Sequence, residues 1–389
     1  MSVPSRTTIR AAALPEDHQV SRRIAVGAGL GLAATAIGAS LTRSPFAGAQ
    51  EASPEATPPA ALQPGGTEVD PQMQEVLDAL ASFDAPALDE VTPEIGRELP
   101  SFADAVQKVL ADRGEPAQEA VGDIRHILIP GLDDNQILAR IYYPLDAPSG
   151  LLPVSVYFHG GGFVIANINT YDASCRALAN ATGGIVASIA YRLAPEYPFP
   201  AAVNDAYAAT QHFLTSAGEV GGDPDRVAVV GESAGGNLAT VVCIRARDED
   251  APLPVHQGLV YPLVTLAPEG EALKSIETYA NAAPLNAAAL DWFGSFYLAD
   301  PADATDPFGS PLLADLSGLP PATIIQAQID PLLSQGTLYA EALEEAGVEV
   351  TLSLYENVTH EFFGMGAVVD KAADAVAELA AELKAAFEG

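Results

Sequence analysis

Two kinds of hydrophobic spacing divide the chain. Residues 123–131 and 135–144 alternate apolar and polar side chains around a short Asp/Asn turn, which predicts an antiparallel hairpin. Continuous apolar runs follow at residues 153–159, 184–191, 227–232, 257–264, 322–330 and 348–356. Helical spacing separates most of these runs, at residues 171–181, 201–216, 234–247 and 333–346. We therefore expect an α/β fold, with a mostly parallel sheet of eight strands covered by helices on both faces and its first two strands antiparallel.

Helical spacing also occurs outside this alternation. Asp70 suits an N-cap before Pro71, and a second helix is predicted over residues 101–111. Residues 275–304 interrupt the order of strands and helices, and they carry the aromatic side chains Trp292, Phe293, Phe296 and Tyr297. The expected organisation is a set of N-terminal cap helices over 70–118 and a main domain over 119–389, with a helical cap insertion at about 275–304.

The charge balance narrows the classes of partner. Hydrophobic residues make up 49% of the chain, and 18 Lys and Arg face 51 Asp and Glu, which gives a formal net charge of −33. Nucleic acids and anionic membranes recruit basic patches, so this excess of acid argues against both partners. It indicates a soluble surface that repels itself.

The first 49 residues have a composition of their own. The twin arginine Arg22–Arg23 precedes an uncharged Gly/Ala-rich run over 24–41, and Ala47–Ala49 supplies small residues. This is the pattern of a secretory signal peptide, of the Tat type because of the arginine pair. We expect export with cleavage near Ala49 and no stable membrane anchor afterwards; an uncleaved anchor is the alternative. Residues 50–69, rich in Pro, Ala and Gly, are expected to form a disordered linker.

A Gly-x-Ser-x-Gly run at residues 231–235 lies between a predicted strand and a predicted helix. This context places Ser233 on the sharp turn at the carboxyl end of a strand, where a nucleophile elbow holds its serine. Gly231 and Gly235 remove side chains that would clash across such a turn. The helix that begins at Ala234 directs N–H groups toward developing negative charge.

A nucleophilic serine needs a base, and the base needs an orienting acid. His360 is the only histidine beyond Ser275, and it follows the last predicted strand. Asp330 ends the preceding strand and is the only acidic residue between Asp315 and Glu341. The order Ser233, Asp330, His360 is the order of the triad in α/β-hydrolases. Asp330 also suits a helix N-cap before Pro331, and the two roles are compatible.

Three consecutive glycines, residues 160–162, follow the third predicted strand. Glycine lets a backbone with free N–H groups approach a ligand, so Gly161 and Gly162 are expected to join Ala234 as donors of an oxyanion hole. A phosphate loop is the rival interpretation, but the Lys-Ser/Thr continuation that it requires is absent from the sequence. His159 is expected to hold the loop rather than act as the base.

These motifs together resemble the bacterial hormone-sensitive-lipase-like carboxylesterases of the α/β-hydrolase superfamily. The resemblance extends from about Asp70 to the C-terminus and rests on the segments 159–164, 191–202, 231–237, 330–332 and 360–363. It implies cofactor-free and metal-free hydrolysis of short to medium acyl esters through an acyl-enzyme. It further implies a helical cap that shapes the substrate pocket, to which we assign Phe163 and Trp292.

The sequence departs from this family at a few positions. Glu232 stands where Asp or Thr is commoner, Glu361 follows the base where Gly is usual, and residues 334–336 replace a typical Asp-Glu-Gly. None of these changes removes a triad member. Glu361 is expected either to crowd the site or to raise the pKa of His360.

Several alternatives stay open at this stage. A related hydrolase would act on amides, lactones or carbamates, and a non-catalytic ligand-binding protein would use the same scaffold without chemistry. The oligomeric state is also open, a homodimer included. Cys175 and Cys243 lie on helices expected to cover opposite faces of the sheet, so we expect two buried thiols rather than a disulfide.

Overall fold

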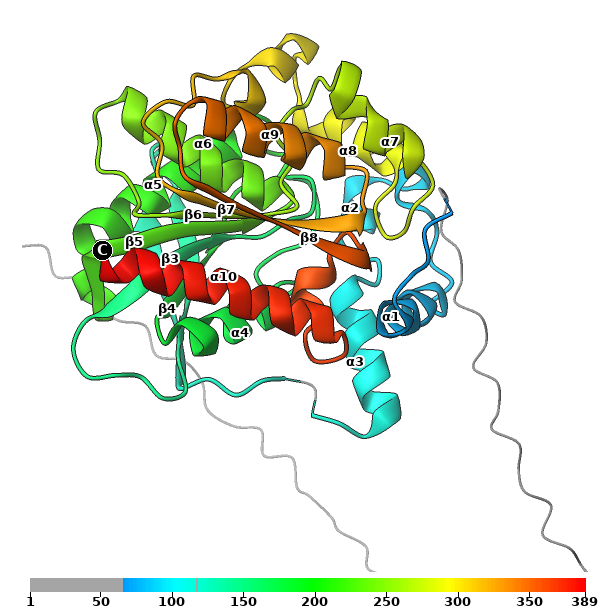
Figure 1. Ribbon diagram of the computed structural model, residues 1–389, viewed down its shortest axis with the longest axis horizontal. Helices are drawn as coiled ribbons and strands as arrows, with labels where there is room; N and C mark the ends of the chain where they lie inside the picture. The colour runs from blue at the N-terminus through cyan, green and yellow to red at the C-terminus, as the bar shows by residue number, and fades with distance from the viewer. Residues whose placement is uncertain (1–65, 117) are drawn as a thin grey trace, which may run out of the picture. The chain divides into compact units, whose positions relative to one another are not determined.

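The computed structural model describes residues 66–116 and 118–389, and an eight-stranded sheet lies at its centre (Figure 1). The strands follow the spatial order β1-β2-β4-β3-β5-β6-β7-β8. Their bounds are β1 Asp123–Pro130, β2 Gln136–Tyr143, β3 Leu152–Phe158, β4 Ile185–Ala190, β5 Gly222–Glu232, β6 Gln257–Val260, β7 Ala322–Ile329 and β8 Val350–Thr359. Strand β2 runs antiparallel to β1 and β4, and all other neighbours are parallel. The predicted α/β fold with eight strands is confirmed.

Helices cover both faces of the sheet, as the apolar strands predicted (Figure 1). One face carries α4 (Asp172–Thr182) and α10 (Asp370–Glu388), and the other carries α5 (Ala201–Ser216), α6 (Ala234–Asp248) and α9 (Leu333–Glu345). Alternate residues of a strand point to opposite faces, so Phe158 of β3 belongs to one core and Tyr157 to the other. Cys175 and Cys243 are buried in these separate cores as free thiols.

The N-terminal helices begin and end at recognisable caps. They are α1 (Pro71–Ala81), α2 (Pro93–Gly96) and α3 (Phe102–Arg113). The Asp70 side chain accepts a hydrogen bond from the N–H of Gln72 at 2.9 Å, and Ser101 with Asp104 forms a capping box. Both predicted helices are therefore present; α1 starts at Pro71 as expected, and α3 begins one residue and ends two residues later than the predicted 101–111.

The folded chain reaches slightly further toward the N-terminus than the sequence suggested. Val69 is fully buried, and the Asn357 amide donates to the Glu68 carbonyl oxygen at 2.7 Å. Residues 66–69, which were expected to belong to the linker, are thus fixed against Asn357 near the end of β8. The expected signal peptide and the rest of the linker lie outside the described residues.

The insertion after β6 forms α7 (Lys274–Thr278) and α8 (Ala287–Tyr297), which contact the N-terminal segment. The Trp292 indole N–H donates to the Val91 carbonyl oxygen at 3.0 Å. Arg97, at the end of α2, donates to the carbonyl oxygens of Val164 at 2.9 Å and Ala194 at 2.7 Å. The two parts of the expected cap therefore meet over the loop after β3. Within the described part of the chain, no helix combines the length and apolar character needed to cross a membrane.

Candidate active site

Ser233 occupies a strained turn between β5 and α6. Its backbone has φ 56° and ψ −117°, a conformation that residues other than glycine rarely adopt. The Ser233 N–H donates to the Val260 carbonyl oxygen at 2.9 Å, and the Leu263 N–H donates to the Ser233 carbonyl oxygen at 3.2 Å. The residues at and after the end of β6 thus hold the serine backbone through both its N–H and its carbonyl oxygen.

The glycines around Ser233 are required for space. A Cβ atom at Gly231 would lie 2.0 Å from the Gly235 carbonyl oxygen, and one at Gly235 would lie 2.0 Å from the Phe158 carbonyl oxygen. No side-chain movement relieves a clash with backbone, so both positions exclude every other residue type. The elbow is therefore packed directly against the end of β3.

The structure brings the three sequence-predicted triad residues together. The Nε2 atom of His360 lies 2.9 Å from the Ser233 Oγ atom, and its Nδ1 atom lies 2.7 Å from an Asp330 oxygen. The other Asp330 oxygen accepts from the N–H of Leu332 at 2.7 Å and fixes the turn before α9. The N-cap of α9 is Leu332 and has no side-chain cap, so the helix N-cap role considered for Asp330 was wrong. These residues follow β5, β7 and β8, whose carboxyl ends meet at one edge of the sheet.

The surroundings of His360 favour its protonated form. Burial alone would lower the pKa of His360, but the neighbouring carboxylates of Asp330, Glu361 and Glu232 raise it above its ordinary value. The hydrogen bond to Asp330 fixes the proton on Nδ1. Nε2 then presents a lone pair to the Ser233 hydroxyl, which is the arrangement that a general base requires.

The glycine loop lies beside the serine. Gly161 has φ 98° and Gly162 has φ 58°, so both need the conformational freedom of glycine. Among the described residues, no acceptor is hydrogen-bonded to the N–H group of either glycine. Gly162 and Ala234 line the same pocket as Ser233, whereas Gly161 is not one of its lining residues.

His159 has a structural position. Its Nδ1 atom lies 2.7 Å from the Gly160 carbonyl oxygen, and its ring stacks on Tyr191 with centroids 4.3 Å apart. Burial lowers the pKa of His159 to about 4, which leaves the ring neutral at physiological pH. The residue buttresses the glycine loop, as expected from the sequence.

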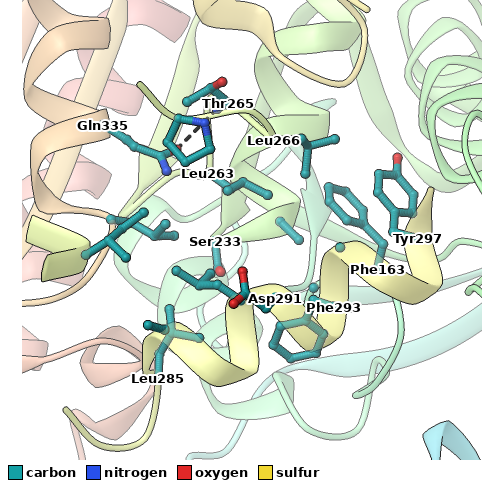
Figure 2. A pocket seen from close by; sticks show the side chains of 18 of the residues that line it. Phe163, Ser233, Leu263, Thr265, Leu266, Leu285, Asp291, Phe293, Tyr297 and Gln335 are labelled. Carbon is teal, nitrogen blue, oxygen red and sulfur yellow. Dashed lines mark hydrogen bonds between the residues drawn. The ribbon is translucent and has the colours of Figure 1, made fainter. Parts of the chain in front are cut away.

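A cavity of about 210 Å³ opens from Ser233 and is lined mostly by apolar side chains (Figure 2). Figure 2 shows Asp291 and Phe293 of α8 beside Ser233, with Phe163 and Tyr297 at one end of the pocket. Asp291 is the only acidic or basic residue among those that line it. Phe163, assigned to the pocket from the sequence, lies there with its ring stacked on Tyr297 at a centroid distance of 3.9 Å.

The assignment of Trp292 to the pocket was wrong. Consecutive residues of a helix point about 100° apart, so when Phe293 faces the cavity Trp292 turns away from it. Its indole ring contacts Phe293 and Phe296 edge to face, and its N–H is bound to Val91. Trp292 therefore joins α8 to the N-terminal segment at Val91 and does not line the pocket.

Glu232, the residue before the nucleophile, is completely buried. The hydroxyls of Tyr157 on β3 and Tyr261 after β6 both donate to its carboxyl group. Burial and the nearby Glu361 raise the pKa of Glu232 to about 7, although the tyrosine hydrogen bonds oppose this shift. The ring of Tyr261 also lies against His360, with centroids 4.5 Å apart, so this carboxyl group adjoins the base.

Glu361, the residue after the base, has a tyrosine partner of its own. The hydroxyl of Tyr171 lies 2.8 Å from both carboxyl oxygens of Glu361. The same hydroxyl fills the space beneath the glycine loop, since a Cβ atom at Gly160 would lie 2.3 Å from it. Sequence reasoning singled out Glu232 and Glu361 but missed all three tyrosines, because nothing in a strand pattern shows where a hydroxyl points.

No group of three or more His, Cys, Asp or Glu side chains in the described ranges is arranged to hold a metal ion. The polar groups that converge near Ser233 belong to the hydrogen-bonded chain of His360 and Asp330 and to the two glutamate–tyrosine clusters. This arrangement can activate a hydroxyl group by proton transfer.

We predict that Glu232→Gln flattens the pH dependence of stability. The pKa of Glu232 is about 7 in the folded protein against an ordinary 4.5, so the stability it contributes is fully present below about pH 4.5 and is lost as pH rises through about 7. In urea unfolding, the free energy of unfolding of the wild type should therefore fall by on the order of 3 kcal/mol because of this group as pH rises. The variant should lack this decrease. The exposed Glu356→Gln serves as the control, and the same pH dependence in wild type and Glu232→Gln would contradict the prediction.

Comparisons with known proteins agree with this geometry. A family described as having the alpha/beta hydrolase fold matches residues 155–364. The carboxylic ester hydrolase LipN of Mycobacterium tuberculosis is 38% identical over 329 residues, covering 82% of this chain and 84% of the relative. An ethyl acetate hydrolase of Pseudomonas putida is 37% identical and covers 62% of this chain and 76% of the relative.

Solved structures give the same result. An esterase of Pyrobaculum calidifontis is 38% identical, with a TM-score of 0.72, and the match covers 82% of this chain and 98% of that one. The ester-hydrolase EH1AB1 from the metagenome of Lake Arreo is 39% identical, with a TM-score of 0.74 and coverage of 82% and 100%. The chain therefore belongs to the α/β-hydrolase family, in its hormone-sensitive-lipase-like branch.

Proposed function

We propose that this protein is a serine carboxylesterase that hydrolyses short to medium acyl esters through an acyl-enzyme. The observation that carries the proposal is the continuous hydrogen-bonded chain from Ser233 through His360 to Asp330, which ends at an apolar cavity. The relatives and solved structures reported above are named as ester hydrolases or esterases, which supports the same chemistry.

In the first half of the cycle, His360 takes the proton of the Ser233 hydroxyl as the oxygen attacks the ester carbonyl carbon. Asp330 stabilises the imidazolium that results and holds its orientation. The N–H groups of Gly161, Gly162 and Ala234 donate hydrogen bonds to the former carbonyl oxygen, which now carries a negative charge. Removal of one such donor typically costs about 3 kcal/mol of transition-state stabilisation. His360 then gives its proton to the alcohol, which leaves an acyl group on Ser233.

In the second half, His360 takes a proton from a water molecule that attacks the acyl carbon. The same N–H groups donate hydrogen bonds to the negatively charged oxygen that forms again. His360 then returns the proton to the Ser233 oxygen, and the carboxylic acid is released. His360 must be neutral at the start of both halves. Because its pKa is raised, activity should decline on the acidic side at a higher pH than an unperturbed histidine would give.

The shape of the pocket supports the acyl preference. Its walls are the apolar side chains of α8 and of the segment after β6, with Leu285, Leu290 and Leu332 on one side. An apolar cavity of this kind binds a hydrocarbon chain by burying it, and its closed end limits the length of the chain. The expected substrate is therefore an ester with an apolar acyl group short enough to fit the cavity.

We predict that Ser233→Ala lowers kcat for a nitrophenyl ester by at least about 10⁴-fold, because the acyl-enzyme cannot form. A fluorophosphonate probe should label the wild type at Ser233 and leave the variant unlabelled. The exposed Ser317, in the loop before β7, provides the matched control, and Ser317→Ala should keep wild-type activity. Full activity in Ser233→Ala would overturn the assignment.

We predict that kcat/KM for a series of nitrophenyl esters is highest with short to medium acyl chains and falls for long ones. Leu285→Ala should move this optimum toward longer chains, because it removes a wall of the cavity. Steady-state rates over the series measure both effects. An optimum that stays at the same acyl length in the variant would mean that the acyl group binds elsewhere.

We also propose that the protein is exported by its twin-arginine segment. Replacing both Arg22 and Arg23 by Lys keeps the charge and should retain the full-length chain inside the cell, since the Tat signal is read through the arginine pair. Cell fractionation and N-terminal sequencing near Ala49 measure the outcome. The matched control replaces Arg6 and Arg10 by Lys, and equal export of both double variants would contradict the proposal.

A further inference from the structure

Glu361 has a backbone conformation that favours glycine. Its φ is 72°, in the left-handed region, where a residue with a Cβ atom is strained. Its side chain is nonetheless held in one place, because the Tyr171 hydroxyl lies 2.8 Å from both carboxyl oxygens. A strained residue persists where its surroundings fix it, and such residues concentrate at functional sites.

The fixed carboxyl group adjoins the reacting nitrogen of the base. One Glu361 oxygen lies 3.8 Å from the His360 Nε2 atom, and the Glu361 side chain is 13% exposed. This distance is too long for a hydrogen bond, so Nε2 keeps its 2.9 Å contact with the Ser233 hydroxyl. Glu361 can thus act on His360 through its charge without competing for the proton that moves.

We infer that Glu361 is a positioning residue that acts as a second carboxylate partner of His360, stabilising the imidazolium formed when His360 takes the Ser233 proton and thereby setting the pH range of hydrolysis. The inference rests on the proposed function. Asp330 acts at the Nδ1 side of the ring and Glu361 at the Nε2 side. Because the imidazolium forms during attack, this attraction is larger in the transition state than in the ground state and lowers the barrier.

The charge on Glu361 is not neutralised by another cation. Within residues 66–116 and 118–389, no Lys or Arg forms an ion pair with Glu361 or with Glu232. In the part of the chain that the structure describes, His360 is the only basic group within ion-pair distance of Glu361. A carboxylate in this position has one cation to stabilise, and that cation exists only when His360 is protonated.

The groups that face His360 come from several elements, and the carboxylates among them all raise the pKa of His360. Asp330 follows β7, Glu232 ends β5, Tyr261 follows β6, and Tyr171 precedes α4 and reaches the base through Glu361. The carboxylates raise the pKa of His360 against the effect of burial. The pKa of Glu361 is itself raised, by burial first and also by Asp330, although His360 and Tyr171 oppose the shift.

The test is the pH dependence of kcat/KM in Glu361→Gln, whose acidic limb reports the protonation of the free enzyme's base. Gln keeps the size of the side chain and accepts a hydrogen bond from Tyr171, so a purely structural role would leave the limb in place. We expect the limb to move to lower pH by about one unit and kcat on the plateau to fall about tenfold. Glu356→Gln, which changes an exposed carboxylate of β8, the strand before His360 and Glu361, should change neither value.

Two further variants keep every outcome decisive. Glu361→Gly adopts the left-handed backbone without strain, so it should fold even if Glu361→Gln does not, and it should show the same movement of the limb. Glu232→Gln separates the effect of the other buried carboxyl group. An acidic limb that stays in place in both Glu361 variants, or moves only in Glu232→Gln, overturns the inference. Activity that survives Ser233→Ala would instead refute the proposed function.

Discussion

The site depends on the left-handed backbone of Ser233. A residue other than glycine in such a conformation costs about 1–3 kcal/mol, and it persists only where neighbouring structure fixes it. Here β6 supplies a hydrogen bond to the serine, the segment after β6 supplies a second, and Gly231 and Gly235 permit contact with backbone on either side. The position of the nucleophile is thus a property of the sheet as a whole. The base and the acid reach it because parallel strands end at one edge.

The fold could be predicted from the sequence, and so could the three residues that meet at Ser233, because both follow local rules. Apolar runs mark parallel strands, Gly-x-Ser-x-Gly marks an elbow only between a strand and a helix, and His360 and Asp330 follow the last two strands. The helix α10 (Asp370–Glu388) was not predicted from the sequence, although its pattern is amphipathic and its leucines are buried. Trp292 was assigned to the wrong side of α8 because composition identifies an aromatic cluster but not which face of the helix meets the cavity.

The tyrosine partners of the two glutamates could not be predicted for a different reason. Tyr157, Tyr171 and Tyr261 come from three separate elements, and each hydroxyl finds its carboxyl group only after the sheet and α4 are assembled. Sequence comparison with the family identified Glu232 and Glu361 as unusual. The structure shows why both carboxyl groups are tolerated: tyrosine hydroxyls donate hydrogen bonds to them. No Lys or Arg of the described residues pairs with either group.

Gly160, the first glycine of the loop after β3, is needed for a different reason from Gly161 and Gly162. It has no positive φ, so it is needed for the room it leaves to the Tyr171 hydroxyl rather than for backbone freedom. Any larger residue there would displace that hydroxyl and release the carboxyl group of Glu361 beside the base. A substitution at Gly160 would therefore act at a distance, through one tyrosine hydroxyl, on the carboxyl group of Glu361.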